Sequence, residues 1–211
     1  MMKLYYFPGN ASFTPHVLLS ETGADYELVL VDRNVDAHKS AEYLELNPSG
    51  RIPALIDDDL VLFETAAICL HIADKYPESR LAPVVGTTER SEFHKWLFYM
   101  ATTLQPEVLL YYYGDRHAVT EDGTAAVKAA AEVRLGDMMA IMDKAVAEGP
   151  YLLGQDYTLL DPYLLMLCRW CRNFAQPPTG YANLGPYLER LSKRSSIANT
   201  FAIEGIEAPY V

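Results

Sequence analysis

Residues 8–15, "PGNASFTP", combine a turn with polar side chains at the expected entry to a helix. The opening Pro-Gly pair is typical of a turn that ends the strand-like run Lys3–Phe7. Ser12 follows, and Thr14 and Pro15 predict a helix start with Thr14 as the N-cap and Pro15 at the first helical position. A helix N-terminus carries unpaired N–H groups and partial positive charge. The segment therefore either holds an anion or simply caps a helix.

A second informative loop is "NPSGRIPAL", residues 47–55. Its Ile52-Pro53 bond lies between a glycine-containing turn and a strand, which is a suitable place for a cis peptide. From position alone, a trans proline that opens an edge strand is the commoner arrangement. A kinked backbone here would turn the N–H and C=O of Ile52 outward, where they can pair with an extended peptide.

A third segment, "FETAAI", residues 63–68, opens a helix with Glu64 and Thr65. The backbone and hydroxyl of Thr65 can hold a carboxylate at the helix N-terminus, and Glu64 can hold an ammonium group. Together they suit a ligand with an amino-acid-like head group. A glutamate in a first helical turn is also ordinary dipole complementation, so the segment alone leaves both interpretations open.

Two further motifs indicate structure rather than chemistry. In "TLLD", Thr158 fits an N-cap and Asp161 can reach back to its N–H, which is a capping box and a folding signal. Cys168 and Cys171 lie within an apolar helical run, so we expect buried structural cysteines rather than a redox pair. The histidines show no metal-ligand spacing, so no metal is predicted.

The elements that must position these motifs follow from the hydrophobic pattern. Four strands are predicted, at residues 3–7, 26–31, 54–57 and 60–63. Three helices are predicted between and after them, at residues 16–24, 40–47 and 64–76. Gly23 is a plausible C′ residue for the first, and Asn47-Pro48 stops the second. This order predicts a parallel pairing of the first two strands and an antiparallel final hairpin around an acidic turn.

Beyond residue 87 the pattern is wholly helical. Four helical segments are predicted, at residues 88–113, 124–148, 158–175 and 184–203. The sequence therefore predicts a small α/β domain over residues 1–80, a linker over 81–87 and an all-α domain over 88–211.

Composition limits the partners. A formal charge of −11 argues against a nucleic-acid-binding surface and gives no sign of a patch for anionic membranes. No apolar run has the length of a signal peptide or a transmembrane helix. Three cysteines cannot all pair within one chain, and their number suits the reducing cytoplasm.

Taken together, "PGNASFTPH", "NPSGRIPAL", "FETAAI" and "YTLLDPYL" resemble the cytosolic glutathione transferases in order and spacing. The resemblance covers the whole chain and is nearest to bacterial beta-class or theta-like members. It implies a thioredoxin-like N-terminal domain followed by a helical domain, a cis Ile52-Pro53 bond, a homodimer and glutathione as co-substrate.

The resemblance also implies which residues hold the ends of glutathione. The backbone of Ile52, followed by Pro53, would pair with the cysteinyl part. Glu64 and Thr65 would hold the γ-glutamyl end. The candidates for the glycine carboxylate are His38, Lys39 and Arg51, of which Arg51 has the fork geometry that suits a carboxylate.

At the sulfur end the chain departs from the beta class. Ala11 stands where those enzymes carry a cysteine, and Gln105 begins the pair that replaces their His-Lys; both positions are candidates for contact with glutathione. Ser12 is the first candidate for a donor to the thiolate and Asn10 the second. A donated hydrogen bond, with a helix N-terminus behind it, lowers a thiol pKa.

The electrophile pocket implied by the family lies along two helices of the second domain. Its candidate residues are Phe13, Tyr112, Tyr113, Arg116, Trp170 and Phe174. They are apolar or aromatic apart from Arg116, so they would suit a small hydrophobic electrophile.

The resemblance implies an enzyme that adds the glutathione thiolate to such electrophiles, in detoxification, or uses glutathione as a reductant. One alternative is a non-catalytic regulatory or ligand-binding member, similar to stringent-starvation proteins. Another is a maleylacetoacetate-type isomerase, which would require a serine-rich first turn that "PGNAS" supplies only in part.

Overall fold

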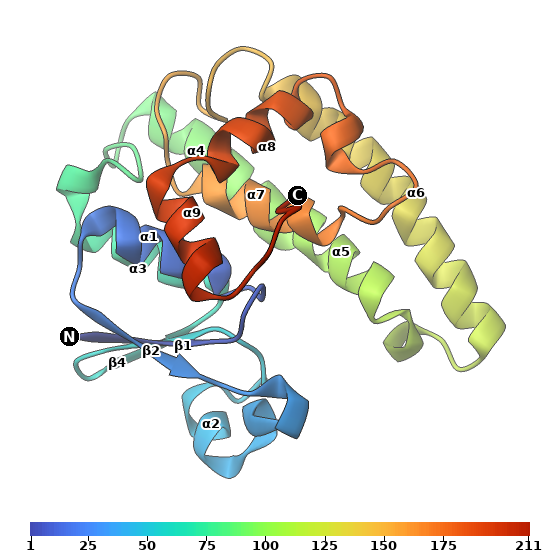
Figure 1. The fold of residues 1–211 in the computed structure, drawn as a ribbon, viewed down its shortest axis with the longest axis horizontal. Helices are drawn as coiled ribbons and strands as arrows, with labels where there is room; N and C mark the ends of the chain where they lie inside the picture. The colour runs from blue at the N-terminus through green and yellow to red at the C-terminus, as the bar shows by residue number, and fades with distance from the viewer. The chain divides into compact units, whose positions relative to one another are not determined.

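The structure is a computed structural model that describes residues 1–211, and the chain divides into two compact units (Figure 1). The first unit comprises Met1–Ala82 together with Ser192–Tyr210, and the second comprises Pro83–Leu191 with Val211. The predicted domain division placed residues 192–210 in the helical domain. In the structure this segment instead packs with the α/β part of the chain.

A four-stranded sheet forms the centre of the first unit. Its strands are β1 (Met2–Tyr6), β2 (Tyr26–Leu30), β3 (Ala54–Asp57) and β4 (Leu60–Phe63), in the order β2-β1-β3-β4. The β1–β2 pair is parallel, and the β1–β3 and β3–β4 pairs are antiparallel, as predicted. Asp58 has a φ of 53° in the two-residue turn of the last hairpin, a conformation that Asp tolerates better than most residues.

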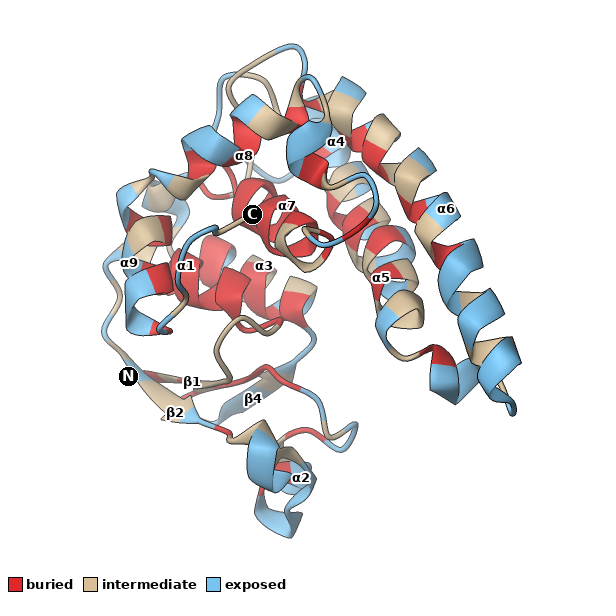
Figure 2. Cartoon of the chain, turned by 45° about the vertical axis from the view of Figure 1, so that its right-hand side comes forward, coloured by how far each residue is buried: buried red, intermediate tan, exposed pale blue.

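Four α-helices complete the first unit: α1 (Phe13–Thr22), α2 (Ala41–Leu46), α3 (Thr65–Lys75) and α9 (Ser195–Ile203). Figure 1 shows α1 and α3 on one face of the sheet and α2 beyond its other face. Residues Phe13–Leu19 of α1 are all buried, which Figure 2 shows as a red helix. Contacts with β1, α3 and α9 surround α1, so it lacks the polar stripe of a surface helix. The arrangement is the thioredoxin-like one that the sequence resemblance implies.

The entry to α1 differs from its prediction. Ser12, not Thr14, is the N-cap residue, because its carbonyl already accepts the first helical hydrogen bond from His16 N–H at 3.0 Å. Pro15 therefore lies at the third helical position. A proline is tolerated there because the first four N–H groups of a helix have no partner within it. At the other end, Gly23 has a φ of 64° and ends the helix as predicted.

Short 3₁₀ turns connect these elements. They comprise Arg33–Val35, Ala37–Lys39 and Pro77–Ser79 in the first unit, and Gly114–His117 and Pro178–Gly180 in the second.

The second unit is helical throughout, as predicted. Its helices are α4 (Thr88–Tyr99), α5 (Gln105–Tyr112), α6 (Glu121–Ala145), α7 (Leu160–Trp170) and α8 (Leu184–Ser192). A π-helical segment, Met100–Leu104, joins α4 to α5 and ends two residues before Pro106, which has no N–H to continue the regular ladder. The chain leaves the helical conformation at Arg194, which is extended, so the predicted helix 184–203 is two helices, α8 and α9.

The Asp161 contact predicted for a capping box is present just before α7, although the N-cap residue is Leu159 and not Thr158. Asp161 accepts a hydrogen bond from Thr158 N–H at 2.7 Å, and it also accepts from Leu152 N–H at 2.9 Å and from the Tyr187 hydroxyl at 2.8 Å. The carboxylate thereby joins the loop before α7 to α8. Burial raises the pKa of Asp161 to about 6, although the hydrogen bonds lower it.

The cysteines agree with a structural interpretation. Cys168 and Cys171 are buried, neither forms a disulfide, and burial raises the pKa of both thiols. No helix combines the length and apolar character that crossing a membrane requires. No group of three or more His, Cys, Asp or Glu side chains is arranged to hold a metal ion.

Candidate functional site

The turn between β1 and α1 forms one part of the candidate site. Asn10 N–H donates to Phe7 C=O at 3.1 Å, and the side-chain oxygen of Asn10 accepts from Ala11 N–H at 2.7 Å. That backbone donor fixes the orientation of the Asn10 amide, because only its oxygen can accept. The amide nitrogen has no partner within the chain, and the residue is half-buried. Asn10 therefore presents a hydrogen-bond donor at the start of α1.

Ser12, the first candidate from the sequence, has a different role in the structure. Its side chain is fully buried, and its hydroxyl donates to Phe7 C=O at 3.2 Å while accepting from Phe7 N–H at 3.3 Å. The single hydroxyl proton is thus directed into the turn. This geometry argues against Ser12 as a donor to a ligand and reverses the order of the two candidates.

The loop 47–53 has an internal scaffold that the sequence analysis did not identify. Asn47 was interpreted only as a helix stop, but its amide donates to Arg51 C=O at 2.6 Å, and the Tyr43 hydroxyl donates to the same carbonyl at 2.7 Å. The Ile52-Pro53 bond is cis, as predicted. Burial raises the pKa of Tyr43, which keeps this hydroxyl a donor.

The side chain and the backbone of Ile52 have different surroundings. The side chain is buried in a cluster with Val31, Tyr43 and Ala54. Neither its N–H nor its C=O forms a hydrogen bond within the chain. Unpaired backbone groups are uncommon next to a buried side chain, and a strand-like ligand would satisfy both.

The start of α3 is connected to the same turn. The Thr65 hydroxyl donates to Ala11 C=O at 3.2 Å, so the N-terminus of α3 lies beside that of α1. Glu64, exposed and directly before α3, has a φ of 75°. This conformation costs a non-glycine residue about 1–3 kcal/mol and is found mainly where neighbouring structure holds it at ligand sites.

Three basic candidates lie near the loop 47–53. The carbonyl of His38 packs against Gly50, where an added Cβ would be 3.3 Å from that oxygen. The side chains of His38 and Lys39 both face Asp36, with closest N–O distances of 3.8 and 2.9 Å. Arg51 is exposed and has no ion-pair partner. Of the three, Arg51 offers the cation that is free to meet an anion.

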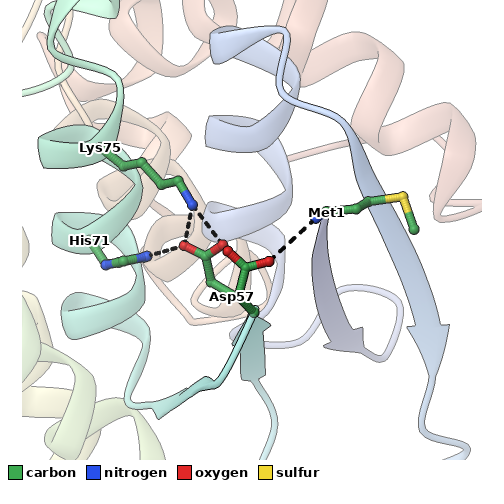
Figure 3. Close-up of polar contacts among 5 residues, drawn as sticks. Met1, Asp57, His71 and Lys75 are labelled. Carbon is green, nitrogen blue, oxygen red and sulfur yellow. Dashed lines mark hydrogen bonds and ion pairs between the residues drawn. The ribbon is translucent and has the colours of Figure 1, made fainter.

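A polar cluster holds α3 to the sheet (Figure 3). Asp57, at the end of β3, accepts from His71 Nε2 at 2.8 Å and from Lys75 Nζ at 2.6 Å. Burial raises the pKa of Asp57, but the hydrogen bonds from Lys75 and His71 outweigh it, so the pKa lies below its ordinary value. Nearby, the Met1 amino group lies 3.8 Å from Asp58. The cluster anchors the helix whose first turn carries Thr65.

The second unit brings several of the aromatic candidates together. The Tyr112 hydroxyl donates to Trp170 C=O, which joins α5 to the end of α7. Tyr111, which the sequence analysis did not select, contacts both the Tyr112 ring, at 5.2 Å between centroids, and the Phe174 ring, at 4.4 Å. Phe174 is itself buried, so it packs against Tyr111 as a core residue of this cluster.

The remaining candidates have separate surroundings. Phe13 is buried in the first unit, where its ring packs on Phe201 at 4.9 Å, so it is a core residue and not part of a pocket wall. The Arg116 guanidinium lies over the Tyr113 ring at 4.2 Å. Gln105 accepts from the Tyr163 hydroxyl at 2.5 Å.

Comparisons with known proteins agree with the fold. The sequence model of the glutathione S-transferase N-terminal domain matches residues 1–74. The chain is 29% identical to glutathione S-transferase GstA of Escherichia coli O157:H7 over 208 residues, which span 98% of this chain and 100% of that protein.

Two solved structures are similar over nearly the whole chain. A glutathione transferase homologue from Sulfitobacter, with bound glutathione, has a TM-score of 0.89 at 27% identity, covering 98% of this chain and 99% of its own. The beta-class glutathione S-transferase of Sphingomonas chungbukensis has a TM-score of 0.85 at 30% identity, covering 97% and 100%. Because it shares 30% identity with this last protein over nearly the whole length of both chains, the chain belongs to the glutathione S-transferase family.

Proposed function

We propose that the protein is a glutathione transferase in which the first unit binds glutathione and the Asn10 amide activates the thiol. The thiolate then attacks a small apolar electrophile or serves as a reductant. The observation that carries this proposal is that the N–H and C=O of Ile52 are both unpaired although its side chain is buried. The non-catalytic alternative is not favoured, since relatives from several species are named glutathione S-transferases.

The chemistry of glutathione matches the groups of the first unit one by one. The N–H and C=O of Ile52, with Pro53 next to it, pair with the backbone of the cysteinyl residue. The exposed Glu64 carboxylate takes the γ-glutamyl ammonium, and the N-terminus of α3 at Thr65 takes its carboxylate. The unpaired Arg51 guanidinium suits the glycine carboxylate.

The remaining glutathione candidates supplement these contacts. His38 and Lys39 add positive charge near Arg51, although both also face Asp36. Ala11 has its N–H bonded to Asn10, so it offers only a small side chain beside the sulfur. Gln105 stays a prediction for a contact with glutathione.

Thiol activation here needs no base on the protein. A free cysteine thiol has a pKa near 8.5, so little thiolate forms at neutral pH. The side-chain N–H of Asn10 donates a stronger hydrogen bond to the sulfur when the sulfur is a thiolate anion, which lowers the thiol pKa. The partial positive charge at the start of α1 also stabilises the thiolate. The thiol proton leaves to water. The sulfur electron pair forms the new bond to carbon while the leaving group departs with its own electron pair.

Residues of the second unit stay our candidates for the electrophile contacts. Tyr112, Trp170, Tyr113 and Arg116 supply aromatic and cationic surface, and an apolar substrate suits such a lining. We also propose a cytoplasmic homodimer with a role in detoxification. β4 exposes Leu60, Val61 and Phe63, which is apolar surface that a partner subunit would cover.

The decisive variant is Asn10→Asp, which keeps the side-chain oxygen that accepts from Ala11 N–H but replaces the donor with a carboxylate oxygen. Loss of one donor to an anion costs about 1.5–3 kcal/mol, so kcat/KM for a chlorinated nitrobenzene should fall roughly ten- to a hundredfold. The loss should shrink as pH rises, since thiolate then forms unaided. Glutathione binding, measured by the shift of Tm, should change little.

The matched control is Asn34→Ala, an exposed asparagine of the same unit. Ser12→Ala should affect stability more than the pH profile, because its hydroxyl bonds only to Phe7. If Asn10→Asp conjugates glutathione like wild type at every pH, the Asn10 assignment is wrong. If wild type shows no Tm shift at millimolar glutathione, the binding site itself is wrong.

A further inference from the structure

The C-terminal end of α9 contacts the turn that carries Asn10. Glu204 directly follows this helix, and its side chain is fully buried. One carboxylate oxygen accepts from Gly9 N–H at 2.8 Å, and the other lies 2.9 Å from His16 Nδ1. All of these residues belong to the first unit. A buried carboxylate is costly unless it is paired, and here its two partners lie directly before and within α1.

Gly9 determines the direction of the residue after it. Its φ of 68° lies in the left-handed region that favours glycine, and it is followed at once by Asn10. A bond that holds Gly9 N–H therefore fixes the Pro8–Gly9 peptide plane, and with the φ of Gly9 set it also fixes the direction in which the chain enters Asn10. A donor to a reacting atom must be held to within a fraction of an ångström, and loops achieve this only with supporting contacts.

Packing alone does not account for a carboxylate at this position. The Phe13 and Phe201 rings already hold α9 to α1, at 4.9 Å between their centroids. A second polar contact between the same helices lies at their other ends, where Glu21 accepts from Arg194 and from the Ser196 hydroxyl. Of these contacts, the one made by Glu204 involves the turn.

We infer that Glu204 is a positioning residue for thiol activation: its carboxylate holds Gly9, and through Gly9 it holds the Asn10 amide in place. His16 fixes the other oxygen of the carboxylate and so orients it. This inference rests on the proposed function, because it assigns Glu204 a role only through Asn10.

Two variants remove the contact with Gly9 in different ways. Glu204→Met has similar length but lacks the oxygen, and Glu204→Asp keeps the charge beside His16 but has a shorter reach. Each should lower kcat/KM near pH 6 by about tenfold, with a smaller loss at higher pH. Glu204→Gln retains an oxygen for Gly9 and should stay within about threefold of wild type. If the methionine variant does not fold, the aspartate variant carries the test.

The control is Glu21→Gln, which weakens the α1–α9 contact at the end remote from the turn and should leave the pH profile of kcat/KM unchanged. A second comparison places Glu204→Met in an Asn10→Ala background, where it should cause no further loss, because the residue through which it acts is gone. Glutathione affinity should be nearly constant across the series.

If the pH profiles of kcat/KM for Glu204→Met and Glu204→Asp superimpose on the wild-type profile, the inference is wrong. It is also wrong if Glu204→Met causes an equal loss with and without Asn10. In both cases an active wild type leaves the proposed function standing. A wild type that neither binds nor conjugates glutathione would overturn the proposed function, and this inference with it.

Discussion

Replacing Asp161 with asparagine should remove a pH dependence from the stability of the second unit. The buried carboxylate accepts from Thr158 and Leu152 N–H groups and from the Tyr187 hydroxyl. Burial outweighs these bonds and raises its pKa to about 6. Asparagine has nearly the same shape and keeps one accepting oxygen, but it does not titrate between pH 4 and 7.

The sign and size follow from the two pKa values. In the unfolded chain Asp161 has its ordinary pKa of 3.8, below the value of about 6 in the folded state. Between these pH values the folded protein binds the proton of Asp161 more tightly than the unfolded chain does. The contribution of this proton to the free energy of unfolding is therefore complete in acid and is lost as pH rises through 6. The full difference corresponds to about 3 kcal/mol, of which about 2 kcal/mol falls between pH 4 and 7.

The assay is urea unfolding of wild type and Asp161→Asn at several pH values and one protein concentration, followed by tryptophan fluorescence. Both tryptophans, Trp96 and Trp170, lie in the second unit, so the signal reports that unit. The free energy of unfolding of wild type, relative to the variant, should decrease as pH rises. Asp156→Asn, an exposed control, should show no such trend. A constant difference, or one that increases with pH, would refute the reasoning.

Two further predictions concern the first unit and the assembly. Asp57→Asn should have the opposite pH dependence: the pKa of Asp57 is lowered in the folded state, so its contribution is present above 3.8 and is lost as pH falls through that lower value. In urea titrations followed by amide hydrogen exchange of β3 and α3, the free energy of unfolding of wild type should exceed that of the variant most at neutral pH, and a difference that widens in acid would contradict the assignment to Lys75 and His71. Sedimentation at micromolar concentration should give twice the chain mass of 23.6 kDa, and a monomer mass throughout would exclude the proposed homodimer.

Much of the fold was predictable because it depends on local signals. The short strands, the acidic hairpin turn and Gly23 at the end of α1 each depend on residues close together in the sequence. The capping box around Asp161 was predictable for the same reason. The cis Ile52-Pro53 bond came from the resemblance, since position alone favoured a trans bond.

The structure differs from the predictions where a contact or a backbone conformation has no local sequence pattern. Ser12 was predicted as a donor because its burial and its bonds to Phe7 have no local signature. Phe13 was assigned to a pocket because its partner, Phe201, lies 188 residues away. The single helix expected over 184–203 fits the apolar spacing of both α8 and α9, and the break shows only in the backbone of Arg194. Glu204 likewise carries no signal until α9 brings it to Gly9.

The return of α9 to the first unit has a consequence for synthesis on the ribosome. The α/β part of the chain is made first, but the partner surface for α1 is made last. Until the final residues emerge, Phe13 lacks Phe201 and the His16 side chain lacks the carboxylate that it meets in the finished protein. A nascent chain stalled before residue 192 therefore exposes an apolar helix face, which makes it a substrate for chaperones, and catalytic competence arrives only with the last part of the chain.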